Sequence, residues 1–507
     1  MLDLFNSVLT WFMKKRIQEV EHFMNNPHDV QQQVLRNLLE TAKSTEWGQK
    51  WGYSDLQHSA AFQERVPVST YEELKPYIDR MMRGEQNILW PGKIDWFAKS
   101  SGTTSSRSKF IPVSPEALED CHYKGGKDLI SIYVNNFPET KIFTGKNLAI
   151  GGSLQVNEQD SEGSSKYGDI SAIIMRNLPF WAQMVRSPSL EVALLSEWDE
   201  KLERMARETI NDNITNLSGV PTWTLLLMER ILEITGKQNM LEVWPNLEVF
   251  THGAVSFTPY EQLFKKLIPS DTMYYQDVYN ASEGFFGIQD QTHSKEMLLM
   301  LDYGVYYEFI ETSELEKENP KVLSLEQVEP GKNYALIIST NGGLWRYNIG
   351  DTVKFTSVNP YRIIISGRTK HFINAFGEEV VIENAEQAIA EACRQTSAEI
   401  DNFTAAPRYF GEKSKASHEW IIEFVHPPQD KNHFEQVLDE TLRKINSDYD
   451  AKRFKDMALQ APIVHHAPKG TFYRWMEKRG KLGGQNKVPR LSNTREHVED
   501  ILEMLKV

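Results

Sequence analysis

Residues 96–114 read Trp-Phe-Ala-Lys-Ser-Ser-Gly-Thr-Thr-Ser-Ser-Arg-Ser-Lys-Phe-Ile-Pro-Val-Ser. Two short extended runs, Ile94–Ala98 and Lys109–Val113, flank a loop made almost wholly of Ser, Thr and Gly. Gly102 lets the backbone turn its N–H groups toward one point, and the hydroxyls add further donors, which suits phosphate oxygens. A flexible linker has a similar composition, so both interpretations stay open on this stretch alone. It is not a Walker A loop, since no Gly-Lys-Ser/Thr follows the first glycine at the required spacing.

Length and composition indicate a globular protein of several domains. The 507 residues exceed one ordinary core, and roughly two to four domains are expected. Hydrophobic residues make up 40% and charged residues 25%, which is typical of globular chains. The formal net charge of −14 argues against a large nucleic-acid-binding face, because such a face needs clustered Lys and Arg.

The cysteines and the N-terminal segment bear on location. The only cysteines are Cys121 and Cys393, so a disulfide framework is excluded. The expected compartment is a reducing cytoplasm. The segment Met1–Met24 carries its basic residues, 14–16, after its first apolar stretch. That order is the reverse of a secretory signal, and no run is long enough to span a membrane. We expect an amphipathic first helix.

Strands and helices alternate over much of the chain, which favours an α/β fold with sheets covered by helices. The predicted strands are Lys146–Gly151, Leu247–Thr251, Thr272–Asp277, Tyr303–Phe309 and Tyr334–Thr340. The predicted helices are Val30–Ser44, Tyr71–Arg83 with Thr70 as its cap, one from Pro115, one marked by Trp198, Leu202 and Met205, one from Pro221 to Gly236, and Pro259–Leu267. Residues 152–169 are polar and rich in Gly and Ser, which predicts a long loop.

The composition changes after Gly367, and a second domain is predicted there. Its expected elements are a helix Glu383–Arg394, a hairpin of Asn402–Phe410 with Glu419–Val425, a helix Lys431–Asn446 and a strand Ala461–His465. This set has an ordinary domain size. We therefore predict a large N-terminal domain, residues 1–366, with mixed β-sheets or a barrel covered by helices, and a smaller, mobile α+β C-terminal domain, residues 367–507.

A cluster of polar residues comes directly after one predicted buried strand, in Val278-Tyr-Asn-Ala-Ser-Glu-Gly-Phe-Phe-Gly287. Open α/β sheets bind ligands at that end of their strands. Glu283 could hold Mg²⁺, because that ion takes oxygen ligands and bridges phosphates. A solvated turn carboxylate is the alternative, and this stretch alone favours the alternative.

Two further stretches carry candidate nucleotide-binding groups. Gly343-Leu-Trp-Arg-Tyr-Asn-Ile-Gly-Asp351 ends an apolar strand in a carboxylate that can accept two vicinal hydroxyls, such as those of a ribose. A plain turn also favours Asp and Gly. Gly367-Arg368 falls at the predicted domain boundary, where an arginine could reach a nucleotide while the domain moves.

In their order and spacing, Ser-Ser-Gly-Thr-Thr, Asn-Ala-Ser-Glu, Tyr-Asn-Ile-Gly-Asp and Gly-Arg…Phe-Gly-Glu resemble the adenylate-forming superfamily of acyl-activating ligases. Within it, other stretches are similar to the Gretchen Hagen auxin-responsive family of acyl acid–amido synthetases. These stretches are Val243-Trp-Pro-Asn-Leu, Thr251-His-Gly-Ala254, Tyr306-Tyr-Glu-Phe309 and Gly483-Gly-Gln-Asn-Lys-Val-Pro-Arg490.

The resemblance implies ATP and Mg²⁺ as cofactors and gives individual residues a role. The ATP phosphates would lie against Ser100, Ser101, Thr103, Thr104 and Ser105. The adenine would lie beside Gly253, Ala254, Asn280, Ser282 and Tyr306. Asp351 would bind the ribose, Glu283 would bind Mg²⁺, and Arg368 would assist from the hinge. Lys487 would reach the α-phosphate and the attacking carboxylate, where charge builds in the transition state; without the resemblance, an exposed loop lysine would be the better interpretation.

The chain also departs from the family pattern. Ser105-Ser106-Arg107 stands where a Gly-Gly pair is common, and Asn348 stands where an arginine is common. For the acyl pocket, the resemblance offers Trp223 as a candidate wall and Trp181 as a weaker one. Each tryptophan on its own is better explained as ordinary core.

The resemblance implies a two-step ligase that adenylates a small carboxylic acid and transfers the acyl group to an amine, expected to be an amino acid. An acyl-CoA ligase shares the first step and is the nearest alternative; a catalytically silent nucleotide-binding protein is the alternative from another class. The sequence leaves open the acid, the amine and the oligomeric state. The 12 Trp and 24 Phe lean only slightly toward an aryl or apolar acid, since most of them must fill core.

Overall fold

The structure is a computed structural model that describes residues 2–506, apart from 57, 101–108, 158–164, 256, 258–259, 316, 369–371, 410–415, 457 and 480–487. The chain divides into two compact units. The first holds Met1–Ser100, Lys109–Ala254 and Leu263–Thr369, and the second holds Lys370–Val507 together with Val255–Gln262. The second unit thus begins close to residue 367, where the sequence places the boundary, and also takes a short segment that the sequence assigns to the first domain.

Helices form the start of the first unit: α1 (Leu2–Asn25), α2 (Pro27–Ala42), α3 (Glu46–Trp51), α4 (Ser59–Arg65) and α5 (Tyr71–Met82). The capping box expected at α5 is present, because the Glu73 carboxylate accepts from the Thr70 N–H (2.7 Å) and hydroxyl (2.9 Å). On α2, the Gln31 amide donates to the carbonyls of Leu301 (2.8 Å) and Val305 (3.0 Å). These bonds tie the helical layer to the central sheet.

A small sheet carries the Ser/Thr loop. Its order is β2 (Lys109–Val113), β1 (Trp96–Ser100), β5 (Lys166–Gly168) and β4 (Leu154–Val156). The two predicted strands β1 and β2 are confirmed and pair antiparallel, with Ser100 opposite Lys109. The prediction of a loop over residues 152–169 is wrong in part, because β4 and β5 lie within it. Each is only three residues long, so neither shows a strand pattern in the sequence; β5 pairs with the open edge of β1, and β4 pairs with β5.

The central sheet has the order β13 (Val322–Ser324), β12 (Val305–Glu311), β14 (Asn333–Thr340), β15 (Tyr347–Val358), β16 (Tyr361–Arg368), β11 (Met297–Leu299), β10 (Gly284–Ile288), β9 (Tyr274–Ala281), β8 (Val249–His252), β7 (Ile214–Gly219), β3 (Lys146–Ala149) and β6 (Arg186–Ser187). From β6 to β9 the neighbours run parallel, and from β9 to β13 they run antiparallel. The carboxyl ends of the parallel strands therefore share one edge.

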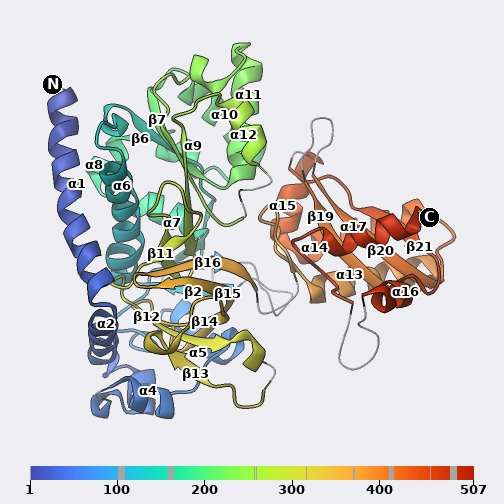
Figure 1. The fold of residues 1–507 in the computed structure, drawn as a ribbon, viewed down its shortest axis with the longest axis horizontal. Coiled ribbons are helices and arrows are strands. Elements are labelled where there is room, and N and C mark those ends of the chain that lie inside the picture. The colour runs from blue at the N-terminus through green and yellow to red at the C-terminus, as the bar shows by residue number, and fades with distance from the viewer. Residues whose placement is uncertain are drawn as a thin grey trace. The chain divides into compact units, whose positions relative to one another are not determined.

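Helices cover both faces of the parallel part of this sheet (Figure 1). On one side lie α1 and α6 (Lys124–Asn136), and on the other lie α10 (Trp198–Thr209), α11 (Pro221–Thr235) and α12 (Glu261–Leu267). Shorter helices are α7 (Ile170–Asn177), α8 (Phe180–Met184) and α9 (Leu190–Ala193). The predicted end of α11 is confirmed, since Gly236 caps it at φ 67°.

The helix predicted from Pro115 begins as a π-helix, Ala117–Tyr123, before α6 continues it. This stretch packs against the start of β10. The Cys121 sulfur accepts a hydrogen bond from the Phe285 N–H at 3.2 Å, and a Cβ on Gly125 would lie 2.6 Å from the Phe285 ring. Single turns of π-helix often occur at functional sites; this one packs behind the turn that carries Glu283.

The second unit is a compact α+β set, as predicted. A short hairpin of β17 (Phe372–Ile373) and β18 (Val380–Val381) precedes α13 (Ile382–Thr396). β19 (Glu399–Arg408) pairs antiparallel with β20 (Ser417–His426), which pairs parallel with β21 (Ile463–Ala467). The remaining helices are α14 (Lys431–Ile445), α15 (Ser447–Arg453), α16 (Thr471–Lys478) and α17 (Glu496–Leu505). The Tyr260 hydroxyl donates to the Ala375 carbonyl at 2.8 Å, which fastens Val255–Gln262 to this unit.

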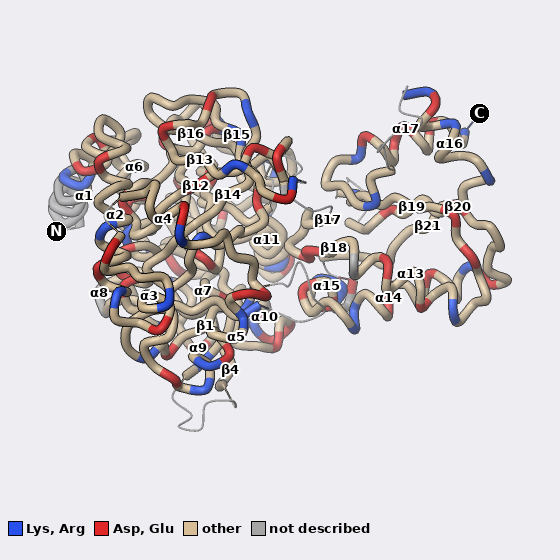
Figure 2. The backbone as a smooth tube through the Cα atoms, turned by 90° about the horizontal axis from the view of Figure 1, so that it is seen from below, with Lys and Arg blue, Asp and Glu red and all other residues tan. Residues whose placement is uncertain are grey.

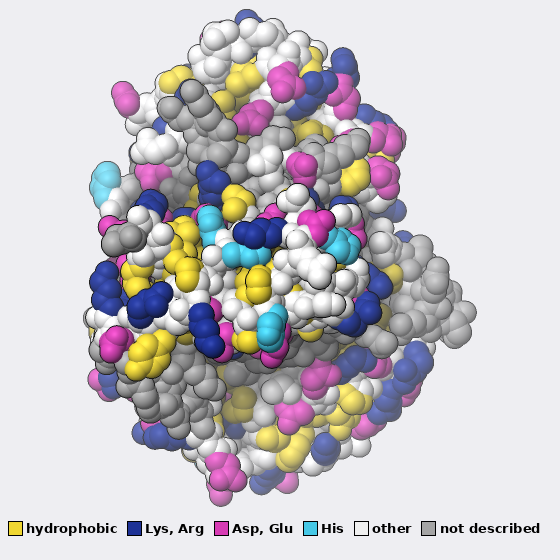
Figure 3. Space-filling model, turned by 90° about the vertical axis from the view of Figure 1, so that its right-hand side faces the viewer, with side chains coloured by type: hydrophobic (Ala, Val, Ile, Leu, Met, Phe, Trp, Pro, Cys, Tyr) yellow, Lys and Arg dark blue, Asp and Glu magenta, His cyan; other side chains and the backbone are white. Residues whose placement is uncertain are grey.

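Acidic and basic residues are interspersed along the backbone, for example on α13 and α14 (Figure 2). On the face in Figure 3, Lys and Arg side chains likewise lie among Asp, Glu and apolar side chains. Within the described part of the chain, no helix combines the length and apolarity needed to cross a membrane.

Candidate functional site

The base of the Ser/Thr loop is formed by the paired ends of β1 and β2. Ser100 is half-buried there and lies in register with Lys109. The loop itself, with Ser101, Thr103, Thr104 and Ser105, lies outside the described residues. Phosphate binding by those four residues therefore stays a prediction.

Lys109 is a buried cation at this base, and the sequence analysis missed it. The residue is 6% exposed, its ammonium group donates to the Tyr347 hydroxyl at 3.3 Å, and it lies over the rings of Tyr71 (5.7 Å) and Tyr347 (6.0 Å). Lysine is rarely buried unless it is paired, and cation–π contacts partly replace lost hydration. The available signal was its position, immediately after a phosphate-like loop and before the apolar residues of β2.

The turn between β9 and β10 presents Ser282 and Glu283, both half-buried. Burial raises the pKa of Tyr71 to about 12, and the nearby Glu283 carboxylate contributes to this rise. The Tyr71 hydroxyl also accepts a hydrogen bond from the Phe110 N–H at 2.8 Å. Tyr71 therefore hydrogen-bonds to the start of β2 and lies within electrostatic range of Glu283, although more than 170 residues separate Glu283 from Phe110 in sequence.

Gly253 and Asn280 meet at the carboxyl edge of the parallel strands. A Cβ on Gly253 would lie 2.6 Å from the Val278 carbonyl oxygen and 3.4 Å from the Asn280 side-chain oxygen. Only glycine allows this approach, because backbone cannot yield to an added carbon. The next residue, Ala254, has φ 68°, a left-handed conformation that costs a non-glycine residue energy and is common at ligand sites.

Asp351 on β15 joins this group through Tyr279. The Tyr279 hydroxyl, from the residue before Asn280, donates to Asp351 Oδ2 at 2.6 Å. Asp351 is 7% exposed, follows Gly350 at φ 92°, and lies in register with Arg368. The Arg368 side chain and the whole of Lys487 lie outside the described residues, so their assigned roles stay predictions.

The other predicted residues lie elsewhere. Tyr306 is 2% exposed, and its ring packs edge-on against Phe62 of α4 at 6.2 Å; the structure does not bring it to Asp351, and its role beside adenine stays a prediction. Trp223 on α11 is half-buried, with its ring 3.9 Å from that of Trp198. The side chain of Trp181 lies outside the described residues. The acyl-wall roles of both tryptophans stay predictions.

The described residues suit a hard cation that is held mainly by its substrate. Among them, no group of three or more His, Cys, Asp or Glu could enclose a metal ion. A single half-buried carboxylate such as that of Glu283 fits Mg²⁺, which keeps several waters and is usually bound through one or two carboxylates plus substrate phosphates.

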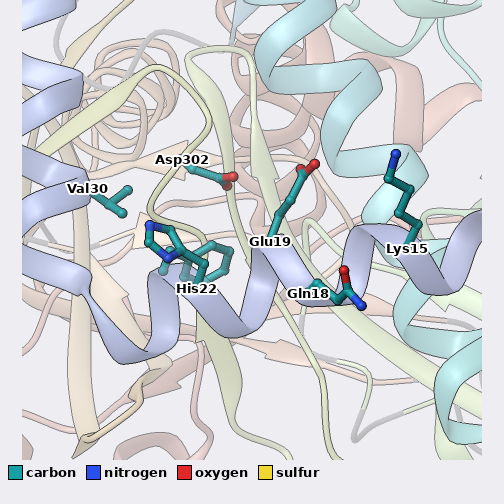
Figure 4. Close-up of a pocket in the computed structure, with 7 residues that line it drawn as sticks. Lys15, Gln18, Glu19, His22, Val30 and Asp302 are labelled. Atoms are coloured by element: carbon teal, nitrogen blue, oxygen red, sulfur yellow. The ribbon is translucent and has the colours of Figure 1, made fainter.

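A cavity of about 380 Å³ lies on another part of the first unit. Figure 4 shows Lys15, Gln18, Glu19 and His22 along α1, with Val30 and Asp302 beside them. The Asp302 carboxylate is already engaged by Arg16 and by Lys124, each at 2.9 Å. The lining includes none of the predicted site residues, so we do not place the substrate there.

Comparison with known proteins matches three domains of one family, in order, along the chain. The profile of the GH3 family N-terminal domain matches residues 16–273, that of the central domain matches residues 298–368, and that of the C-terminal domain matches residues 383–496. A curated relative is the indole-3-acetic acid-amido synthetase GH3.3 of Arabidopsis thaliana, 23% identical over 94% of this chain and 91% of that protein. Another is the jasmonoyl–L-amino acid synthetase JAR4 of Nicotiana attenuata, 25% identical over 67% of this chain and 68% of that protein.

Solved structures share the fold over nearly the whole chain. The GH3.15 acyl acid amido synthetase aligns with a TM-score of 0.61 at 16% identity, covering 96% of this chain and 95% of that one. A 2-hydroxyisobutyryl-CoA ligase aligns with a TM-score of 0.56 at 12% identity, covering 95% and 92%. The expected fold class is confirmed, and so, at the level of the family, is the expected enzyme class of an AMP-forming ligase. With the family domains matched in order from residue 16 to residue 496, the chain belongs to the GH3 family.

Proposed function

We propose that this protein is an ATP-dependent acyl acid–amido synthetase, which joins the carboxyl group of a small acid to an amine, expected to be that of an amino acid. The observation that carries the proposal is the convergence of three motifs. Tyr279, the residue before Asn280, donates a hydrogen bond to Asp351. Lys109, at the base of the Ser/Thr loop, donates one to Tyr347, which lies on the same strand as Asp351. The names of the relatives point to the same chemistry.

The nucleotide would lie along the carboxyl edge of the sheet. Ser100 and the loop that follows it would hold the phosphates, and the Lys109 ammonium group would add positive charge at the base of this loop. The adenine would lie beside Gly253, Ala254, Asn280 and Ser282. The Asp351 carboxylate would accept the ribose hydroxyls, and its bond from Tyr279 would fix the direction of that carboxylate.

Glu283 would hold Mg²⁺. When bound, that ion would neutralise charge on the phosphates and favour the departure of pyrophosphate. The short turn between β9 and β10 and the π-helix packed behind it hold the Glu283 backbone in place. This chain therefore supplies one positioned carboxylate, and the phosphates would supply other oxygen ligands.

The reaction has two steps. A carboxylate oxygen of the acid attacks the α-phosphorus of ATP, and pyrophosphate leaves; an amine then attacks the acyl carbon, and AMP leaves. Lys487 would stabilise the charge that builds on the phosphate oxygens in the first step. The C-terminal domain would turn about the segment near Arg368 between the two steps. We place the reaction in the cytoplasm, which suits two free cysteine thiols.

The test measures pyrophosphate release from ATP and Mg²⁺ across a panel of carboxylic acids, each with pooled amino acids, with CoA or with neither. We expect the full turnover to need both an acid and an amino acid, with amide detected by mass spectrometry. Turnover with CoA in place of the amino acid would make the protein an acyl-CoA ligase instead. Lys487→Ala should lose adenylation while still binding ATP, whereas the exposed Lys478→Ala should behave as the parent; full adenylation by Lys487→Ala would overturn the role of that lysine.

A further inference from the structure

One face of the parallel strands carries a band of buried and half-buried polar side chains. Parallel neighbours in register share a face, and so do alternate residues of one strand. Arg186 of β6, Asn147 of β3 and Asn216 of β7 are in register and form one row. Ser218, Thr251 and Gln276 form the next row toward the carboxyl edge. We call these six residues the polar band.

Most of the polar band is shielded from solvent. Arg186 and Asn216 are each 8% exposed, Thr251 is 7% exposed and Gln276 is fully buried. The same face carries Val249 and Tyr274, which form a small apolar cluster with Tyr133 of α6, and α6 runs alongside this part of the sheet in Figure 1. A buried sheet face is normally apolar, so a band of this kind needs a reason.

Asn147 forms hydrogen bonds with Asn216 and Ser218. Two other members of the band, Arg186 and Gln276, keep polar atoms without a hydrogen-bond partner among the described residues. The Asn147 amide donates to the Asn216 side-chain oxygen and to the Ser218 hydroxyl (3.0 Å). Among the residues that the structure describes, Nε and Nη1 of Arg186 and Oε1 of Gln276 have no hydrogen-bond partner. The band therefore offers charged donors at one end and an acceptor at the other.

A buried guanidinium needs an anion. Arginine cannot lose its proton at ordinary pH, and a buried charge is costly unless it is paired. Burial lowers the pKa of Arg186, and the carboxylate of Glu208 only partly opposes this. That carboxylate is itself held by the Ser189 N–H (2.5 Å) and hydroxyl (3.0 Å). The guanidinium is thus left with unused donors suited to a carboxylate.

The position of Arg186 limits which carboxylate it can bind. Strands lie about 4.8 Å apart, so β6 is about 14 Å across the sheet from β8, whose end carries Gly253. An amino acid acceptor is too short to bridge this distance, because its α-carboxylate and its amine share one carbon and an acidic side chain extends only a few bonds further. The far end of an elongated acid could reach it.

We propose that Arg186, at the end of the polar band, binds a second carboxylate at the far end of the acyl substrate, so that the preferred acid is an elongated dicarboxylic acid rather than a wholly apolar one. This inference rests on the proposed function for the reacting end of the acid. The aromatic content of the sequence slightly favours an aryl or apolar acid, and this inference favours a dicarboxylic acid instead.

The test compares unbranched α,ω-dicarboxylic acids of increasing length with their monomethyl esters. In acid-dependent ATP–pyrophosphate exchange, the parent should prefer one dicarboxylate over its ester by about 10- to 100-fold in kcat/KM, the range of one charged hydrogen-bonded pair. Arg186→Met should lose that preference and leave kcat/KM for the ester unchanged. Arg186→Lys should keep part of the preference. Arg204→Met, at an exposed arginine, should match the parent for both acids. An equal loss for both acids in Arg186→Met, or a parent that prefers the esters, would overturn the inference.

Binding without ATP separates this inference from the proposed function. The melting temperature should rise with the preferred dicarboxylate, and Arg186→Met should lose this rise. A protein that shows the shift but exchanges no pyrophosphate with any acid would refute the proposed activity and keep the anion site. Exchange with simple acids and no shift or preference for any dicarboxylate would refute the anion site and keep the activity.

Discussion

The buried ion pair between Arg346 and Glu308 gives the sharpest prediction on stability. The two side chains are 4% and 1% exposed and meet in a bidentate pair, with both N–O distances 2.9 Å. Arg346 also donates to the carbonyls of Gln63 (2.9 Å) and Val66. The pair therefore joins β12, the residue before β15 and the end of α4.

Glu308→Gln keeps the shape of the side chain but leaves the Arg346 guanidinium without its counter-charge. Removing one partner of a buried pair costs about 3–5 kcal/mol, a large share of the roughly 5–15 kcal/mol that holds a typical domain folded. Urea unfolding followed by circular dichroism should show this loss in the midpoint, with an unchanged slope because the surface exposed on unfolding is unchanged.

Glu391→Gln is the matched control. Glu391 pairs with Arg394 at 2.6 Å on the outside of α13, where the arginine side chain is 70% exposed. Solvent screens surface pairs of this kind, and they contribute little to stability, so this variant should unfold close to the parent. A loss for Glu308→Gln no larger than that of the control would refute the reasoning that burial makes the first pair critical.

Three further predictions follow from single contacts. Gly125→Ala should lower the free energy of unfolding by about 1–3 kcal/mol, because its methyl would strike the Phe285 ring at 2.6 Å; Gly126→Ala, with nothing within 4 Å of the new carbon, should not, and equal melting temperatures would contradict this. Burial lowers the pKa of Lys201 from 10.5 to about 8, so the unfolded state holds the proton more strongly, and the stability of the parent relative to Lys201→Met should rise between these pH values by about 3 kcal/mol; a flat difference in pH-dependent unfolding would count against it. Asp351→Asn should raise the KM for ATP at least about tenfold, since a charged hydrogen bond contributes about 1.5–3 kcal/mol, and an unchanged KM would remove Asp351 from the nucleotide site.

Much of the fold could be predicted from local pattern. Strong periodicity or a cap marks three features that the structure confirms: the strand before Glu283, the helix that ends at Gly236, and the α+β set after residue 370. The strands β4 and β5 were missed because three residues show no alternation, and because β5 depends on the edge of β1 and β4 depends on β5. The π-helix was missed because Phe285, which it packs against, lies far away in sequence.

The candidate site shows the same division. Motif order placed Asn280, Glu283 and Asp351 near one another, and the bond between Tyr279 and Asp351 supports that grouping. Lys109 and the polar band at Arg186 were not predicted. The only local signal was the position of Lys109 after the Ser/Thr loop, because burial of a charge depends on strands and helices that only the tertiary structure brings together.

Acid-dependent exchange of labelled pyrophosphate into ATP, measured with no amine and no CoA present, tests the central claim most directly. If a carboxylate attacks the α-phosphorus, the step is reversible on the enzyme, and label should enter ATP only when a substrate acid and Mg²⁺ are both present. Asp351→Asn should exchange more slowly at limiting ATP. An acid that supports amide formation and ADP release, with no exchange and no AMP, would contradict the account.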